Sequence, residues 1–305
     1  MTRDSNVHGV LIVDKPSGPT SHDVVAWARR ALGTRAVGHA GTLDPMATGV
    51  LVLAIGEGTK LVPYLTLDDK AYEFELALGT ETDTLDAQGT VVASQAVPTL
   101  DAAMLERALA GFVGEQDQRP PVFSAIKVEG EALHRRARRG EHVEAPMRRV
   151  TVHSLELRSV SPLVLRVHAS KGFFVRSLGR DIARAISTVG HVTVLRRLAS
   201  GSFRVEDAIP GESLRAARDD DALRPSLLRR VLPLRAALAS LPSVTLDAVA
   251  ESDARAGRLV RIAAEVLGGT VVAMLDARGG LVAIGERRGN ALAVRRGFRS
   301  LPVDD

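Results

Sequence analysis

A polar loop punctuated by glycines runs directly into a long apolar stretch at residues 38–51 (GHAGTLDPMATGVL). The loop carries one carboxylate, Asp44, and the proline that follows biases this aspartate toward extended backbone. Gly38, Gly41 and Gly49 permit turns and close approach of another backbone or a ligand. The chain must therefore leave an irregular loop and enter a buried strand, and the loop presents Asp44. An isolated Asp-Pro pair is more often a simple turn cap, so the loop alone leaves both roles open.

Hydrophobic periodicity predicts a chain in which strands and helices alternate. Residues 70–79 alternate apolar and polar side chains, the pattern of a strand with one buried face, which places Tyr72 on the core side. Ser21 and Thr99 are expected to cap two helices. The expected strands cover residues 8–13, 50–55, 70–79, two segments within 150–169, 271–275 and 281–284, and the expected helices cover residues 21–32, 99–112 and 175–188.

The composition excludes several classes of chemistry. The chain of 305 residues contains no cysteine, so disulfides, thiolate catalysis and cysteine metal sites are ruled out. No apolar segment approaches membrane-spanning length and no apolar targeting region follows the first charges, so we expect a soluble, cytoplasmic protein without membrane contact. The net charge is only +4, but six arginines cluster within residues 135–149, a density suited to binding phosphates.

The composition of the sequence changes near residue 210, and we place a domain boundary at residue 240. Residues 114–149 are rich in Arg, Pro and Gly and poor in periodicity, so we expect an exposed basic insertion there. The final sixty or so residues contain a hairpin signal around residues 277–280 and form a separate unit. We therefore expect a large domain over residues 1–240 that carries the insertion, a small β-rich domain over residues 241–305, and a monomer as the default state.

Six further segments accompany the Asp44 loop, at residues 9–18, 70–72, 82–89, 123–127, 171–178 and 191–198. Together with the loop, and in this order, they resemble the bacterial TruB family, the tRNA pseudouridine-55 synthases. The resemblance is close over about residues 8–205 and loose in the tail. It implies an α/β (α+β) pseudouridine synthase fold: a mixed, largely antiparallel central sheet flanked by helices and loops, with a small β-rich C-terminal domain.

The resemblance implies an isomerase that converts uridine to pseudouridine at position 55 in the T arm of tRNA. The bond between the sugar and N1 breaks, the base turns, and C5 rejoins the sugar, so no cofactor, metal or energy source is expected. The target nucleotide must be flipped out of a folded RNA, which costs roughly a few kcal/mol of unstacking. Attack of a carboxylate on the sugar, attack on the base, and elimination all remain open.

The resemblance also assigns roles to individual residues. Asp44 corresponds to the family's nucleophilic aspartate, and Arg176 to the arginine that holds this carboxylate through two hydrogen bonds and keeps it ionised. Tyr72 corresponds to the tyrosine that stacks on the base and accepts a proton. Without the resemblance, Arg176 would be a surface arginine at a helix start and Tyr72 a core residue. The other expected substrate-binding residues are His39, Phe174, Leu195, Asp86 and Lys127.

Three of these positions have a plainer alternative. By the resemblance, His39 fills the space that the flipped nucleotide leaves and Leu195 forms an apolar wall, but alone they would be a satisfied loop histidine and a core leucine. Asp86 is equally suited to an ordinary turn. At three positions the family often has tyrosine and this chain has another ring-bearing residue, so the tyrosine hydroxyl is missing. These residues are Phe123, His134 and Phe174.

Recognition of the RNA is expected to rest on its backbone and shape. We expect four arginines of the insertion to contact phosphates of the T arm, namely Arg135, Arg136, Arg138 and Arg139. The alternative is that these arginines pair with Glu131 and Glu141 on an exposed helix, where ion pairs are common and weak.

Other functions fit the sequence less well. A P-loop NTPase is excluded because residues 56–60 lack the required spacing, and the Gly-x-Ser-x-Gly pentapeptide of a serine hydrolase is absent. A non-catalytic tRNA-binding or RNA-folding chaperone remains the alternative function. Binding alone would not require Asp44, Tyr72 and Arg176 together.

Overall fold

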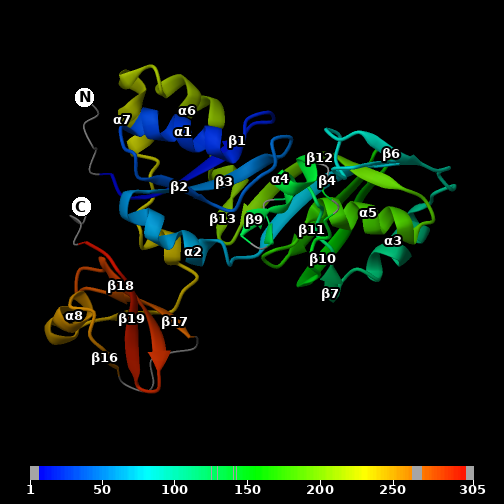
Figure 1. Cartoon of the computed structure of the whole chain (residues 1–305). Coiled ribbons are helices and arrows are strands. Elements are labelled where there is room, and N and C mark those ends of the chain that lie inside the picture. Colours follow the sequence, from blue (N-terminus) through cyan, green and yellow to red (C-terminus); the bar gives the residue numbers. More distant parts are fainter. Residues whose placement is uncertain are drawn as a thin grey trace.

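A ten-stranded mixed sheet runs through the larger part of the molecule, in the order β14-β1-β3-β12-β4-β11-β10-β7, with β2 paired to β3 and β13 to β12 (Figure 1). The computed structural model describes residues 7–124, 126–128, 130–139, 141, 143–262 and 270–299, and of residues 127, 132, 134 and 138 the backbone only. The pairs β1/β14 and β3/β12 are parallel, and the other described pairs in this sheet are antiparallel, which confirms the expected fold class. The strands are β1 (Gly9–Lys15), β2 (Val37–Ala40), β3 (Thr48–Ile55), β4 (Lys70–Leu78), β7 (Gly114–Gln118), β10 (Arg148–Val160), β11 (Leu163–Ala169), β12 (Gly190–Ser200), β13 (Phe203–Arg204) and β14 (Ile209–Pro210).

Helices cover the sheet in two groups (Figure 1). One group, α1, α6 and α7, lies beside β1, and the other, α3 and α5, covers the half that contains β4, β11 and β10. Apolar side chains of both groups meet the sheet in one large core. The helices and helical turns are α1 (Ser21–Leu32), η1 (Gly56–Leu61), α2 (Val62–Leu65), α3 (Ala102–Ala110), α4 (Leu133–Arg138), α5 (Val175–Ala185), η2 (Val205–Asp207), α6 (Gly211–Ala217), η3 (Asp221–Leu223), α7 (Arg224–Leu228), η4 (Ala236–Leu238) and α8 (Ala248–Arg255).

The expected helix caps were wrong at both positions. Thr20, not Ser21, caps α1: its hydroxyl accepts from the Asp23 amide and the Asp23 carboxylate accepts from the Thr20 amide, a complete capping box. Asp101, not Thr99, caps α3 by accepting from the Met104 amide at 2.7 Å. Both true caps lie one or two residues from the expected ones, within the usual error of boundaries drawn from sequence.

The expectation of an exposed insertion over residues 114–149 was wrong at its start and end. Residues 114–118 form the edge strand β7, which pairs with the first residues of β10. The five residues Gly-Glu-Gln-Asp-Gln show no apolar alternation because an edge strand needs few buried side chains. Between these strands lie α4 and a short hairpin of β8 (Lys127–Val128) and β9 (Glu131–Ala132). A second small hairpin, of β5 (Thr80–Thr82) and β6 (Val91–Ser94), follows β4.

A separate five-stranded sheet forms near the C-terminus (Figure 1). Its order is β15-β17-β18-β19-β16, and the expected hairpin is present as β17 and β18. This sheet packs on the larger one through a shared apolar cluster that joins Val10 and Val50 to Leu275 and Ile284. In the part of the chain that is described, no helix has the length and apolar character needed to cross a membrane. The strands are β15 (Ser243–Thr245), β16 (Val260–Arg261), β17 (Val271–Leu275), β18 (Leu281–Arg288) and β19 (Ala291–Gly297).

Candidate active site

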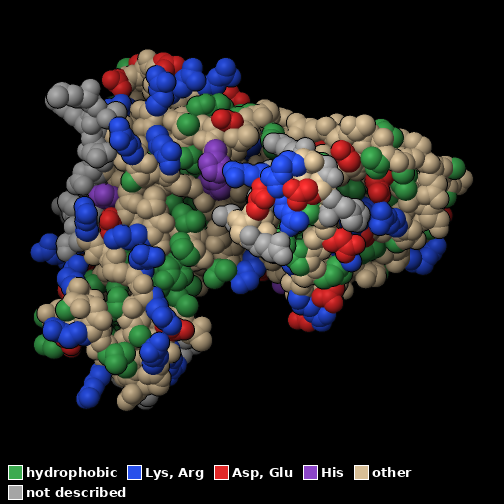
Figure 2. All heavy atoms as spheres, viewed as in Figure 1, with side chains coloured by type: hydrophobic (Ala, Val, Ile, Leu, Met, Phe, Trp, Pro, Cys, Tyr) green, Lys and Arg blue, Asp and Glu red, His purple; other side chains and the backbone are tan. Residues whose placement is uncertain are grey.

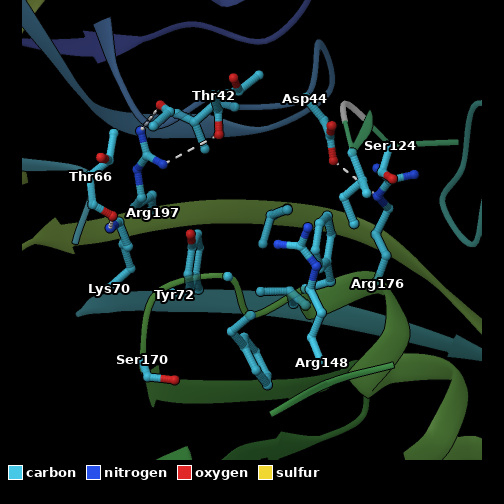
Figure 3. A pocket seen from close by; sticks show the side chains of 18 residues that line it. Thr42, Asp44, Thr66, Lys70, Tyr72, Ser124, Arg148, Ser170, Arg176 and Arg197 are labelled. Carbon is cyan, nitrogen blue, oxygen red and sulfur yellow. Dashed lines mark hydrogen bonds and ion pairs between the residues drawn. The ribbon is translucent and has the colours of Figure 1, made fainter. Parts of the chain in front are cut away.

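The loop between β2 and β3 presents Asp44 to an open cavity of about 440 Å³ (Figure 3). The side chain of Asp44 is 36% exposed, so a ligand in the cavity can reach it. The cavity is also lined by Tyr72 from β4 and by Leu195 from β12, two strands that are direct neighbours in the sheet. Strands far apart in sequence thus bring three of the expected site residues to one place.

Arg176 is a buried bridge between two carboxylates. It lies in the first turn of α5 and is only 5% exposed, which rules out the surface arginine considered from the sequence. Its Nε contacts Asp44 at 2.9 Å and its Nη1 contacts Asp86 at 3.1 Å. Arg176 also donates to two backbone carbonyls: Nη1 donates to Thr84 at 2.7 Å, and Nη2 donates to Phe123 at 3.0 Å. The expected grip on Asp44 through two hydrogen bonds is therefore not formed, because the second edge of the guanidinium faces Asp86.

Asp86 forms the turn that was one of its two expected roles, whereas its contact with substrate stays a prediction. It is buried, and its carboxylate accepts from the Gln88 amide at 3.0 Å and the Thr84 hydroxyl at 2.7 Å, as in a turn. The same carboxylate holds Arg176 from the side opposite Asp44. Asp86 does not line the cavity, so in this structure it acts on Asp44 only through Arg176.

Phe174 lines the cavity at the start of α5, and its backbone is fixed by a residue that the sequence did not single out. The side-chain amide of Gln118, on β7, accepts from the Phe174 N–H at 2.8 Å and donates to the Phe174 carbonyl at 3.0 Å. This double contact orients the first turn of α5, and with it Arg176. The edge strand that was expected to be an insertion therefore supports the site.

His39 lies on β2 and does not line this cavity. Its ring meets the ring of His22 edge to face, with centroids 5.2 Å apart. Burial, together with the neighbouring His22 charge, lowers the pKa of His39 to about 4, so the ring is neutral at physiological pH. Its buried Nδ1 has no hydrogen-bond partner among the described residues. The expected role beside a flipped nucleotide stays a prediction.

Three buried polar side chains hold the backbone of the Asp44 loop, and none was expected at the site, although Ser21 was expected to cap a helix. The Ser21 hydroxyl accepts from the Leu43 amide at 2.9 Å and donates to its carbonyl at 3.0 Å. Lys15 and Arg197, which are 0% and 1% exposed, donate to further carbonyls of the loop. Both lie inside segments that resemble the TruB family, which is the one signal that pointed to them. A loop anchored this densely holds its carboxylate in a fixed position.

Burial lowers the pKa of two lysines near the loop. The pKa of Lys15 falls to about 8, because desolvation of the ammonium outweighs the attraction of Asp44. The pKa of Lys70, which lines the cavity, also falls to about 8 by burial, with the nearby Arg197 charge adding to the effect. Lys70 donates to the carbonyls of Thr66 and Asp68 and holds the segment that precedes β4.

The arginines of the expected RNA clamp are largely engaged with acidic neighbours. Arg136 contacts Glu141 at 2.8 Å, and Arg139 contacts Glu131 at 2.5 Å and Glu141 at 2.6 Å. Figure 2 shows acidic and basic side chains interleaved over this face. The pairing with Glu131 and Glu141, which was the alternative to phosphate binding, is therefore present. Arg135 is exposed, and the side chains of Arg138 and Lys127 lie outside the described part of the structure.

Arg148 and Arg149 at the start of β10 differ in their surroundings. Arg149 pairs with Glu115 at 3.0 Å, whereas Arg148 lines the cavity and makes no ion pair with a described residue (Figure 3). Arg148 is thus a cation at the cavity mouth that an anionic ligand can reach. Within the described residues, no group of three or more His, Asp or Glu side chains is arranged to hold a metal ion.

Solved structures share this fold. One chain of a Cbf5-Nop10-Gar1 complex matches with a TM-score of 0.75 and 26% sequence identity, over 96% of this chain and 85% of that chain. A chain of an H/ACA RNP bound to a substrate RNA containing 2'-deoxyuridine matches in fold, with a TM-score of 0.73 over 98% of this chain and 94% of that chain.

Relatives found by sequence share a higher identity with this chain than the chain of the Cbf5-Nop10-Gar1 complex does. Proteins named tRNA pseudouridine synthase B are 41% identical over 281 residues in Xanthomonas campestris pv. campestris and 45% identical over 267 residues in Novosphingobium aromaticivorans. These alignments cover 92% and 83% of this chain and 90% and 86% of the relatives. Two family models match consecutive segments: TruB family pseudouridylate synthase (N terminal domain) at residues 29–175, and tRNA pseudouridylate synthase B C-terminal domain at residues 176–239.

The fold, the cavity with its aspartate and arginine, and these relatives define a pseudouridine synthase, an isomerase. Within that class, the chain belongs to the TruB family.

Proposed function

We propose that this enzyme isomerises uridine to pseudouridine at position 55 in the T arm of tRNA, with Asp44 as the nucleophile. The observation that carries the proposal is the contact of 2.9 Å between the buried Arg176 and Asp44 at the edge of the cavity. A carboxylate held in one orientation by a guanidinium is suited to attack an electrophilic carbon or to stabilise a cationic sugar. Substrate specificity for tRNA is supported by the names of the sequence relatives.

The residues of the cavity divide the work of the reaction. Tyr72 and Leu195 line the cavity from neighbouring strands and offer apolar surface to a flipped uracil, which offsets the cost of unstacking. In the reaction, the bond from C1′ to N1 breaks, the base turns, and C5 bonds to C1′ and gives up its proton. Asp44 stabilises the sugar or the base while they are apart. The Tyr72 oxygen accepts the proton from C5 while its own proton passes to solvent, and N1 takes up one proton, so the product is an isomer of the substrate. The same groups serve whether Asp44 attacks the sugar, attacks the base or assists an elimination.

The RNA clamp remains part of the proposal. Arg135, Arg136, Arg138 and Arg139 contact phosphates of the T arm once Arg136 and Arg139 exchange their acidic partners for phosphate oxygens. Exposed ion pairs of this kind contribute little to stability, because water screens them, so phosphate oxygens can replace the carboxylates. Replacing all four by alanine is expected to weaken tRNA binding and its salt dependence. Unchanged affinity and salt dependence would exclude the clamp. We further propose that the enzyme acts as a monomer in the cytoplasm.

The test is pseudouridine formation in an unmodified tRNA T-arm stem-loop without added metal, cofactor or nucleotide. Wild type is expected to convert position 55, and Asp44→Asn to bind the RNA without converting it. Asp219→Asn is the matched control, because that carboxylate is 55% exposed and pairs only with surface arginines in the described structure. Conversion by Asp44→Asn at the wild-type rate would remove Asp44 from the mechanism. Tight binding without product from wild type would favour the chaperone alternative.

A further inference from the structure

Arg197 is a fully buried cation without a carboxylate partner in the described structure. It is 1% exposed and is among the largest fully buried side chains. Each of its three nitrogens donates to a backbone carbonyl: Nε to Val50 at 2.6 Å, Nη2 to Gly41 at 3.0 Å, and Nη1 to Thr42 at 3.4 Å. Buried guanidinium groups normally pair with carboxylates or phosphates. The guanidinium of Arg197 therefore holds backbone and does not neutralise a carboxylate.

The three carbonyls belong to the two ends of the Asp44 loop. Gly41 and Thr42 follow β2, and Val50 lies in β3. A guanidinium is planar and rigid, and its nitrogens lie at fixed distances from one another. By binding carbonyls at both ends of the loop, this fork of donors fixes the distance between the segment that enters the loop and the segment that leaves it. Lys15 acts on the middle of the same loop, through the carbonyls of Pro45 and Ala47. Arg197 is thus the clamp that sets how wide the loop opens toward the cavity, as Figure 3 shows for its contact with Thr42.

The backbone contact between β12 and β3 fixes the position of Arg197. The two strands pair in parallel with Arg197 opposite Gly49. A Cβ at Gly49 would lie 2.1 Å from the carbonyl oxygen of Arg197, so only glycine permits this approach. Gly41 differs: a Cβ there would meet Nη1 of Arg197 at 3.5 Å and Cε of Lys70 at 3.9 Å, which are ordinary contacts, and its φ of +95° is what favours glycine. Gly49 therefore lets the backbone of β12 approach β3 at Arg197, which sets where the guanidinium begins.

We propose that Arg197 is a positioning residue for the isomerisation: it holds the Asp44 loop at the width at which the carboxylate meets Arg176 and the target nucleotide. This inference rests on the proposed function of the Asp44 site. Arg197 moves no proton and forms no bond with the substrate. A lysine has the same charge but one point of attachment, so it cannot span both ends of the loop. Loss of the fork shifts Asp44 relative to Arg176 and slows the chemical step more than it weakens RNA binding.

The test compares Arg197→Met and Arg197→Lys with Arg196→Met. Arg196 is the neighbour in the same strand; its side chain pairs with Asp14 at 2.7 Å and donates to the Thr48 hydroxyl at 3.3 Å, and it holds none of the three carbonyls that Arg197 holds. Three quantities are measured in each variant: the single-turnover rate, the Kd for a T-arm stem-loop, and hydrogen exchange of the amides at residues 41–50. We expect Arg197→Met to lower the single-turnover rate about 100-fold, because small displacements of a reacting group cost that much. The Kd should change less than about threefold.

Hydrogen exchange reports on the loop whether or not the protein catalyses the reaction, so it tests the role of Arg197 separately from the proposed function. The amides at residues 41–50 should exchange faster in Arg197→Met, partly recover in Arg197→Lys, and match wild type in Arg196→Met. Unchanged exchange in Arg197→Met, or a wild-type rate in a variant whose loop exchanges faster, would overturn the positioning role. A loss of rate explained entirely by global unfolding, with exchange raised equally across the chain, would overturn it too. An inactive wild type whose loop still loosens in Arg197→Met would refute the proposed function and leave the clamp standing.

Discussion

Replacing Lys15 by methionine tests how the Asp44 loop is held. Lys15 is fully buried, and methionine is an unbranched side chain one atom shorter that lacks the charge and the donor. In the folded protein Nζ donates to three carbonyls, those of Pro16 at 2.9 Å, Pro45 at 3.1 Å and Ala47 at 2.8 Å. The substitution therefore removes a desolvated charge and leaves three acceptors without a donor.

The size of the effect follows from two opposing terms. Burial lowers the pKa of Lys15 from 10.5 to about 8, so keeping the group charged costs roughly 3 kcal/mol near pH 7. Three unsatisfied carbonyls cost about 5 kcal/mol together, at the lower half of the usual range. Lys15→Met is thus expected to lose about 2 kcal/mol of unfolding free energy at pH 7.

The pH dependence gives this prediction its sign. Between the folded pKa of about 8 and the unfolded value of 10.5, the unfolded chain binds a proton at Lys15 that the folded chain has released. Stability contributed by this group therefore rises with pH in that window. The methionine variant lacks that gain, so its deficit grows from about 2 kcal/mol at pH 7 to about 5 kcal/mol near pH 10. Lys70 titrates similarly in both proteins and cancels in the difference.

The measurement is urea unfolding of both proteins at pH 7, 8, 9 and 10, with the difference in unfolding free energy plotted against pH. A difference that stays constant or shrinks above pH 8 would show that burial does not depress the pKa of Lys15. A variant as stable as wild type at pH 7 would show that the three carbonyls find other donors.

Three other substitutions test separate parts of the site. Asp86→Asn should lower the unfolding free energy by about 3 kcal/mol in urea and slow catalysis, because it removes one of the two carboxylates that hold the buried Arg176; equal stability would contradict this. Gly49→Ala should cost about 3 kcal/mol or more in thermal unfolding, because φ is +99° and the new Cβ meets a carbonyl of β12; a folded, active variant would exclude the close approach. Arg148→Ala should weaken tRNA binding several-fold and reduce the salt slope by about 1, whereas the ion-paired Arg149→Ala should change both less; equal effects would remove Arg148 from the interface.

Local features of the fold were readable from the sequence. Helix α1 follows the spacing of its apolar residues and ends at Gly33, which takes the left-handed conformation at φ 67°. The hairpin of β17 and β18 follows its turn residues in the same way. Helix α5 was expected to reach residue 188 but ends at Ala185, because the backbone turns at Ser187, where φ is +61°. Patterns of this kind need only neighbours within a few residues.

The support of the site was not readable, because it joins segments far apart in the chain. Arg197 reaches a carbonyl 156 residues away, and nothing in the local pattern of β12 distinguishes this arginine from Arg196. Strand β7 is polar because it lies at an edge, so hydrophobic alternation could not reveal it. The family resemblance named Asp44, Tyr72 and Arg176 as candidates, because these residues lie in segments similar to the family. How the three side chains lie relative to one another could be seen only in the structure.

Because backbone carbonyls are neutral, they bind the buried cations near the Asp44 loop without cancelling their positive charge. Lys15, Lys70 and Arg197 are all held by neutral backbone oxygens within the described structure. Carboxylate partners would satisfy the same hydrogen bonds, but they would cancel the positive charge and repel an approaching phosphate. Carbonyls leave that charge to act on the cavity, where a nucleotide with its phosphates must enter if the proposed function is correct. The cost is the lowered pKa of both lysines, so the same burial that anchors the loop confines its full positive charge to pH values below about 8.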